Sequence, residues 1–148
     1  MSDIFSIVGS SLDAQNARMG AIASNLANAD SVAAPGTAPY RAHEVVFEAS
    51  PLDPTDSDSD GTSTNDTTAD DPGVSVLGTV LSNAAPKTTY DPSSPYADAQ
   101  GYVTGSNVDP VHQMVDLIDS SNSYSASVAV LQQADRVDQQ LLSSFQVS

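Results

Sequence analysis

Two long segments with helical periodicity, one at each end of the chain, most constrain the fold. Residues 3–29 contain no proline, and apolar side chains recur there at the seven-residue spacing typical of helices that pack as coiled coils. Gln15 is the one polar residue among the eight heptad positions. The larger seam residues are Phe5, Val8, Leu12, Met19, Ile22 and Leu26. We expect a helix about 40 Å long, at 1.5 Å per residue.

The second helical segment opens with a clear start signal. Asp109 is suited to the N-cap position and Pro110 to the first helical position, where its missing N–H costs nothing. After Pro110 the chain continues to Phe145 without glycine or proline. Alternating three- and four-residue spacing predicts an apolar seam here too. It comprises Met114, Leu117, Tyr124, Val128, Leu131, Leu142 and Phe145.

The second seam is interrupted near its end by Asp135 and Asp138. Either the last turns of the helix meet a different neighbour or, as we expect, the apolar stripe drifts there onto neighbouring positions of the helix. These are Ala134, Val137 and Leu141. Both seams are narrow stripes, which is typical of helices that pack against other helices.

Between the helical segments the composition becomes that of a small β module. Alternating apolar runs predict strands at 40–47, 74–81 and 87–90. Residues 52–72 carry seven Asp and no basic or aromatic side chain, so we expect a disordered acidic insert there. The predicted fold is α+β, with terminal helices that pair as a coiled coil. Its parts are an N-terminal helix at 1–31, a central β-rich module at 32–106 and a C-terminal helix at 107–148.

Charge and composition exclude several classes of protein. With 4 Lys and Arg against 19 Asp and Glu, the net charge is −15, so we expect no binding to nucleic acid or anionic lipid. The absence of cysteine excludes disulfides and thiolate zinc sites. No apolar run is long enough to span a membrane. The first residues also lack the basic start and continuous apolar stretch of a cleaved signal peptide.

Motifs for metal binding or catalysis are weak. The string at 56–61 (DSDSDG) matches the first half of an EF-hand loop, but Thr67 replaces the Glu expected at its twelfth position. Only weak calcium association at Asp56 to Asp60 stays open. His112, Asp116 and Ser120 share one helix face, and we interpret them as surface residues without an oxyanion hole. We therefore expect no catalytic residue, no metal and no cofactor, and thus no enzyme.

Two asparagines stand in the last turns of the first helical segment. One interpretation is that Asn25 and Asn28 cap the end of the helix. The other is that their side chains bridge the helix to backbone groups of the following loop or of an adjacent subunit. The sequence leaves both interpretations open.

Several short motifs follow one another in a set order. They are ASNLANAD at 23–30, PYRA at 39–42, PYADAQGYV at 95–103 and NVDP at 107–110, followed by MVDLI and SYSA. In this order they resemble the motifs of bacterial flagellar axial proteins, the rod and hook group, over nearly the whole chain. The positions that match the family motif include Asn25, Asn28, Tyr40, Asn107 and Asp109.

The resemblance implies a structural subunit of the proximal rod in the flagellar basal body. In that family the terminal helices stack with those of neighbouring subunits into a hollow shaft, which crosses the periplasm and transmits motor torque. The implied partners are further copies of the chain, other proximal and distal rod proteins, and the protein that joins the export gate to the basal body. The flagellar type III apparatus would export the chain without a cleaved signal peptide.

Two other classes remain open at this point. One is a secreted coiled-coil adaptor or adhesin-like module, which predicts a discrete oligomer in solution. The other is a small hydrolase that acts on the cell wall, which predicts loss of activity when one carboxylate or histidine is removed.

Overall fold

The computed structural model describes residues 2–50 and 73–145 as an α+β fold. In chain order the elements are α1 (Ser2–Ala27), β1 (His43–Ser50), β2 (Gly73–Leu81), β3 (Thr88–Tyr90), β4 (Tyr102–Thr104) and α2 (Pro110–Phe145). The N- and C-terminal helices and the small sheet region agree with the fold class that the sequence predicts. The predicted acidic insert at 52–72, with its EF-hand-like string, lies outside the described residues.

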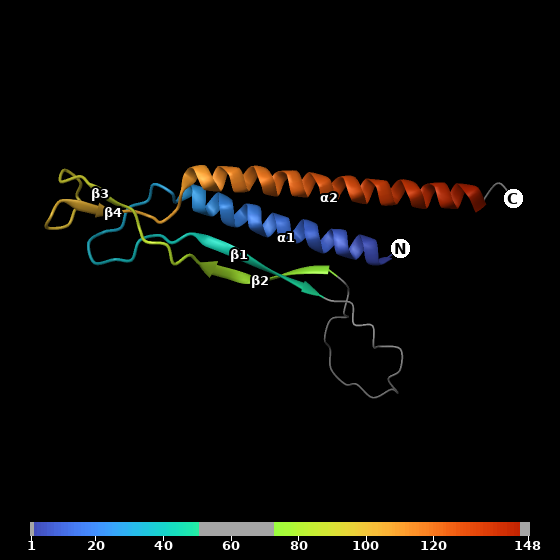
Figure 1. The fold of residues 1–148 in the computed structure, drawn as a ribbon, viewed down its shortest axis with the longest axis horizontal. Helices are drawn as coiled ribbons and strands as arrows, with labels where there is room; N and C mark the ends of the chain where they lie inside the picture. Colours follow the sequence, from blue (N-terminus) through green and yellow to red (C-terminus); the bar gives the residue numbers. More distant parts are fainter. Residues whose placement is uncertain (1, 51–72, 146–148) are drawn as a thin grey trace, which may run out of the picture.

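Helix α1 is the middle layer of the fold. Helix α2 runs antiparallel along one side of it, and the β1–β2 pair lies along another side (Figure 1). Because α2 has 36 residues and α1 has 26, the C-terminal part of α2 continues past the beginning of α1. The last turns of α2 therefore have no residue of α1 opposite them.

Strands β1 and β2 form an antiparallel pair with one irregularity. Along β1, Val45 and Phe47 are half-buried, whereas Glu44 is exposed, as expected for a strand with one covered face. The register shifts between Val46 and Phe47, where Leu77 of β2 has no residue opposite it and is exposed. This two-against-one arrangement is a β-bulge, which increases the local twist of the pair.

Strands β3 and β4, with the loop between them, form a lobe at the end of the molecule where α1 ends and α2 begins (Figure 1). The sequence predicts β3 but misses β4, which is only three residues long. The Asp91 N–H donates to the Gly101 carbonyl at 3.0 Å, closing the loop. The rings of Tyr90 and Tyr102 meet edge to face at 5.3 Å. We call residues 88–104 the β3–β4 lobe.

The buried apolar residues of the described chain are mostly small. They are Val8, Ala14, Ile22, Ala29, Ala42, Val103 and Val108. The one compact cluster among them comprises Ala29, Ala42 and Val108, against which Tyr40 packs. Since burial contributes roughly 25 cal/mol per Å² of apolar surface, such side chains supply little hydrophobic free energy. Larger apolar side chains such as Leu12, Phe47 and Leu117 are half-buried between the elements and add to this contribution.

We predict that Gly101→Ala loosens the β3–β4 lobe. Gly101 has φ +83°, and an added Cβ would lie 3.0 Å from Cε2 of Tyr90. Left-handed strain in a non-glycine residue costs about 1–3 kcal/mol. We expect amide hydrogen exchange at Asp91, whose N–H bonds to Gly101, to become about tenfold faster.

The matched control is Gly9→Ala in α1, where an added Cβ meets nothing within 4 Å. This variant gains helix propensity, up to about 1 kcal/mol, and leaves exchange at Asp91 unchanged. Equal exchange rates at Asp91 in the Gly101→Ala variant and the parent chain would contradict the prediction.

Candidate functional site

Asn25 is a polar side chain only 1% exposed, in the last turns of α1. Its Nδ2 donates to the His43 carbonyl and to Oε1 of Gln113, both at 2.9 Å. Its Oδ1 accepts from the His43 N–H at 2.8 Å and from the Tyr40 hydroxyl at 3.1 Å. An amide has two donor hydrogens and two acceptor lone pairs, so all four are used. One side chain thus joins α1, the loop that follows it, β1 and α2.

Tyr40 extends this network towards the core cluster. Its hydroxyl lies 2.9 Å from Nδ1 of His43 and 3.1 Å from Oγ of Ser24. The rings of Tyr40 and His43 meet edge to face at 5.3 Å. Tyrosine has one hydroxyl hydrogen, which it gives to Asn25, so the bond to His43 forms at the same time only when Nδ1 of His43 carries a hydrogen.

A second asparagine ties the entry of α2 to the sheet region. Oδ1 of Asn107 accepts from the Ala42 N–H at 2.7 Å. Its Nδ2 donates to the carbonyls of Ser82 and Ala84, at 3.3 and 3.0 Å. The segments before β1, after β2 and before α2 are therefore held by one amide.

The remaining motif residues make local helix caps. Oδ1 of Asp109 accepts from the Val111 N–H at 3.1 Å, and α2 begins at Pro110, as the sequence predicts. Nδ2 of Asn28 donates at 2.8 Å to the Ser24 carbonyl of its own helix. Each of the two interpretations therefore holds for one asparagine. Asn28 caps the end of α1, and Asn25 bridges α1 to other elements.

Helices α1 and α2 pack against each other, and most of the predicted seam residues are at least half-buried. Those buried or half-buried in the single chain are Phe5, Val8, Leu12, Met19, Ile22, Leu26, Leu117, Tyr124, Val128 and Leu131. Met114 and Leu142 are 52% and 66% exposed in the single chain, so they are not buried by α1, and their part in an assembly seam stays a prediction. The side chain of Phe145 is outside those that the structure describes.

The predicted drift of the second seam is wrong at Val137 and Leu141, which are both exposed, whereas Ala134 is half-buried. Because Asn25 contacts Gln113 and the helices are antiparallel, residues whose numbers add up to about 138 lie opposite each other. By this rule the residues of α2 from about Val137 onward lie beyond the first residue of α1. No packing against α1 is available to them.

Two buried polar atoms in the described residues have no hydrogen-bond partner, namely Oγ of Ser120 and Oε1 of Gln15. Ser120 is fully buried, which corrects its interpretation as a surface residue. His112 is exposed, so the two side chains are not presented to solvent together. An unpaired buried polar atom costs about 1–3 kcal/mol, and both therefore weaken the interior.

The face of α2 opposite α1 is apolar and exposed. Its residues, which we call the α2 outer face, are Val111, Met114, Val115 and Ile118, each more than half exposed. They recur at the three- and four-residue spacing of one helix face. Of these four residues only Met114 belongs to the predicted seam, although Val111, Val115 and Ile118 also recur at helical spacing.

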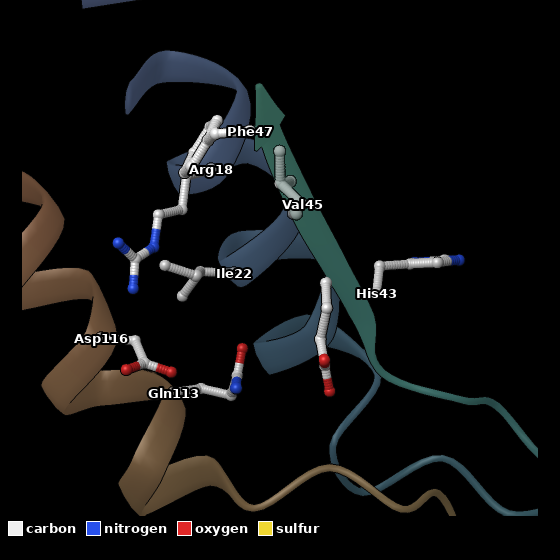
Figure 2. A pocket seen from close by; sticks show the side chains of 9 residues that line it. Arg18, Ile22, His43, Val45, Phe47, Gln113 and Asp116 are labelled. Carbon is white, nitrogen blue, oxygen red and sulfur yellow. The ribbon is translucent and has the colours of Figure 1, made fainter. Parts of the chain in front are cut away.

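A cavity of about 300 Å³ lies between α1, β1 and α2. Figure 2 shows Arg18 from α1 and Asp116 from α2 on one side of it, and Ile22, Val45 and Phe47 around it. The ring of His43 points away from these side chains. Among the described residues no three His, Cys, Asp or Glu side chains gather as a metal site would require. No helix in that part of the chain is long and apolar enough to cross a membrane.

Comparison with known protein families gives a match at the C-terminal end. Residues 99–144, which include β4 and nearly all of α2, match the family described as flagellar basal body rod FlgEFG protein C-terminal.

Curated relatives match most of the chain, and each bears the name flagellar basal-body rod protein FlgC. The relative from Escherichia coli O6:H1 is 44% identical over 129 residues, which are 87% of this chain and 86% of that protein. The Salmonella typhimurium protein is 43% identical over the same shares of both chains. The Bacillus subtilis protein is 32% identical over 139 residues, covering 84% of this chain and 85% of its own.

We predict that Asn25→Ala destabilises the junction by about 3 kcal/mol, because it leaves the buried His43 N–H and the Gln113 side chain without partners. Urea unfolding followed by circular dichroism measures the change. Asn28→Ala is the control, since Asn28 bonds only within its own helix end, and it should cost less than about 1 kcal/mol. Equal losses in the two variants would contradict the bridging role of Asn25.

We predict that Ser120→Ala stabilises the chain by about 1–2 kcal/mol, because it removes the unpaired buried hydroxyl and adds helix propensity. The midpoint of the same urea transition should rise. Ser121→Ala, at the exposed neighbouring position, gains helix propensity alone and should give a smaller increase. A decrease for Ser120→Ala would show that its hydroxyl has a stabilising partner.

Proposed function

Because the chain belongs to the family of flagellar basal-body rod proteins named FlgC, we propose that it is a subunit of the proximal rod that assembles through its terminal helices. The observation that supports this most is the identity of 32–44% to FlgC proteins over 84–87% of the chain. The chain is a structural subunit of the flagellar basal-body rod and serves motility. The finer assignment to the proximal rod rests on the name that the relatives share and on the motif order.

The α2 outer face supports assembly through the helices. Its four apolar side chains are exposed in the single chain although the opposite face of α2 packs on α1. An exposed apolar patch on a helix marks a surface that another protein covers. The covering element in our proposal is a terminal helix of a neighbouring rod subunit, so that α1 and α2 pair as a coiled coil within a larger bundle.

The last turns of α2 are a second surface for neighbours. They extend past the beginning of α1, and Leu142 is exposed there. A helix that is longer than its partner within the chain can pack against the next subunit along an axis. Repeated contacts of this head-to-tail kind generate an open helical assembly where the rotation between neighbours does not close into a ring. We propose that this assembly is the shaft that spans the periplasm and transmits torque.

The proposed partners are further copies of the chain, other proximal and distal rod proteins and the protein that joins the export gate to the basal body. The proposed route of export is the flagellar type III apparatus, without a cleaved signal peptide. The relatives are structural rod proteins, and we propose that this chain has no catalytic activity. Their names give no support to an adaptor, an adhesin or a hydrolase.

The experiment that tests the proposal is deletion of the coding region, followed by complementation with an epitope-tagged copy. We expect swimming to be lost on deletion and restored by the tagged chain, and the tag to co-purify with hook–basal bodies. Unchanged motility after deletion, with the tag absent from basal bodies, would overturn the proposal.

We predict that Ile118→Asp on the α2 outer face abolishes swimming and leaves the fold and secretion intact. Ile118 is 60% exposed, so the single chain tolerates the change, but a carboxylate buried between subunits loses its hydration. The spread of cells in soft agar measures swimming. Asp119→Asn, at the neighbouring exposed position, should swim normally. Normal swimming of Ile118→Asp would place the subunit contact elsewhere on the helix.

A further inference from the structure

The hydrogen bonds around the Tyr40 hydroxyl can be assigned hydrogen by hydrogen. Its oxygen lies 3.1 Å from Oδ1 of Asn25, 2.9 Å from Nδ1 of His43 and 3.1 Å from Oγ of Ser24. Each of these contacts needs one hydrogen between its two atoms, and the tyrosine hydroxyl supplies one. The other two hydrogens must therefore come from the neighbouring side chains.

The orientation of the Asn25 amide decides where the tyrosine hydrogen goes. The His43 N–H, 2.8 Å away, must face the amide oxygen, and the His43 carbonyl, 2.9 Å away, must face the amide nitrogen. A flipped amide would set oxygen against oxygen and N–H against N–H. The atom beside the Tyr40 hydroxyl is thus Oδ1 of Asn25, which has no hydrogen to give. In this contact Tyr40 is the donor.

The hydrogens of the other two contacts belong to Ser24 and His43. The serine hydroxyl can rotate to direct its hydrogen at Tyr40. The contact with Nδ1 of His43 then requires a hydrogen on Nδ1. If the ring carried its hydrogen on Nε2 alone, the oxygens of Tyr40 and Asn25 would face each other without a hydrogen, although Asn25 is only 1% exposed. The bonds of the ring nitrogens thus select the tautomer.

Both charge states of the histidine satisfy this arrangement. The neutral ring with its hydrogen on Nδ1 donates to Tyr40, and the imidazolium, which carries a hydrogen on each nitrogen, donates in the same way. Protonation adds a hydrogen only at Nε2. That nitrogen takes no part in the bonds among Asn25, Tyr40 and Ser24.

The ring of His43 points away from the charged side chains near it. Arg18 from α1, Glu44 from β1 and Asp116 from α2 line the cavity from which the ring is turned (Figure 2). The Arg41 guanidinium is held on backbone carbonyls at the end of β2. The ring also lines a groove of about 480 Å³ between α1 and β2, whose other lining residues are the uncharged Ala17, Ala21, Thr79 and Leu81. The charge of a protonated ring is therefore turned towards an uncharged groove.

We infer that His43 keeps a hydrogen on Nδ1 whether its ring is neutral or protonated, so that the junction of α1, β1 and α2 keeps its hydrogen bonds while the histidine titrates. A histidine in a buried network is often a pH switch. Here His43 is instead a positioning residue whose change of charge leaves the bonds of Asn25 in place. The inference concerns the single chain and does not rest on the proposed function.

The experiment is NMR spectroscopy of the full chain labelled with ¹⁵N, which reports the hydrogens on both ring nitrogens. The sequence contains two histidines, so the spectrum is simple to assign. We expect His43 to carry a hydrogen on Nδ1 at about pH 8 and at about pH 5, the ends of the range in which histidine ordinarily changes charge. His112, which is exposed on α2, is the internal reference and should show no fixed Nδ1 hydrogen at the higher pH.

A second measurement follows the junction itself. The side-chain amide hydrogens of Asn25 should exchange at least about tenfold more slowly than those of the exposed Asn122, at both pH values. Tyr40→Phe is the matched variant, because it removes the acceptor of the Nδ1 hydrogen and keeps an aromatic ring. In this variant neutral His43 should lose its fixed hydrogen on Nδ1.

Three results would overturn the inference. The first is a hydrogen on Nε2 alone, or a mixture of tautomers, for His43 at the higher pH. The second is slow exchange of the Asn25 amide that is lost at the lower pH, because the junction would then open on titration. The third is a tautomer that Tyr40→Phe leaves unchanged. If that variant does not fold, the spectra of the parent chain still decide the first two results.

Discussion

The arrangement of the whole fold depends on the buried amide of Asn25. It makes four hydrogen bonds to groups from the loop, β1 and α2, and it does so at 1% exposure. In such surroundings an unpaired polar group is costly, so any arrangement that separates these elements leaves several groups unsatisfied at once. The amide therefore fixes where α2 and β1 lie relative to α1. A hydrophobic side chain at this position would allow the elements to slide.

The local features of the fold could be predicted from the sequence, and the long-range ones could not. Helix periodicity and the cap at Asp109 involve neighbouring residues, so they are readable in a short window. Two partners of Asn25, His43 and Gln113, lie 18 and 88 residues away, and no local pattern identifies them. Strand β4 escapes prediction because three residues are too few to show alternation.

The register of α2 could not be predicted for a different reason. The helix is apolar on two faces, since Leu117 and Leu131 are half-buried on the α1 side while Val115 and Ile118 are exposed on the other. One predicted apolar stripe can therefore be placed on either face, and Met114 lies on the exposed one. A helix with apolar residues on both sides is suited to burial between neighbours on both sides. The assembly that we propose thus explains why α2 has two apolar faces and why the sequence pattern alone does not say which of them packs on α1.

The small hydrophobic core of the single chain is also consistent with the assembly that we propose. Its buried apolar residues are mostly alanine and valine, and the buried oxygens of Gln15 and Ser120 stay unpaired. A modest interior is suited to the export and assembly that we propose, because a weakly stabilised fold costs less to open before export. In the assembly that we propose, α2 is covered on its outer face as well, and this contact supplies further stabilisation. High stability of the single chain would add nothing to the shaft, since the shaft is held together by contacts between subunits.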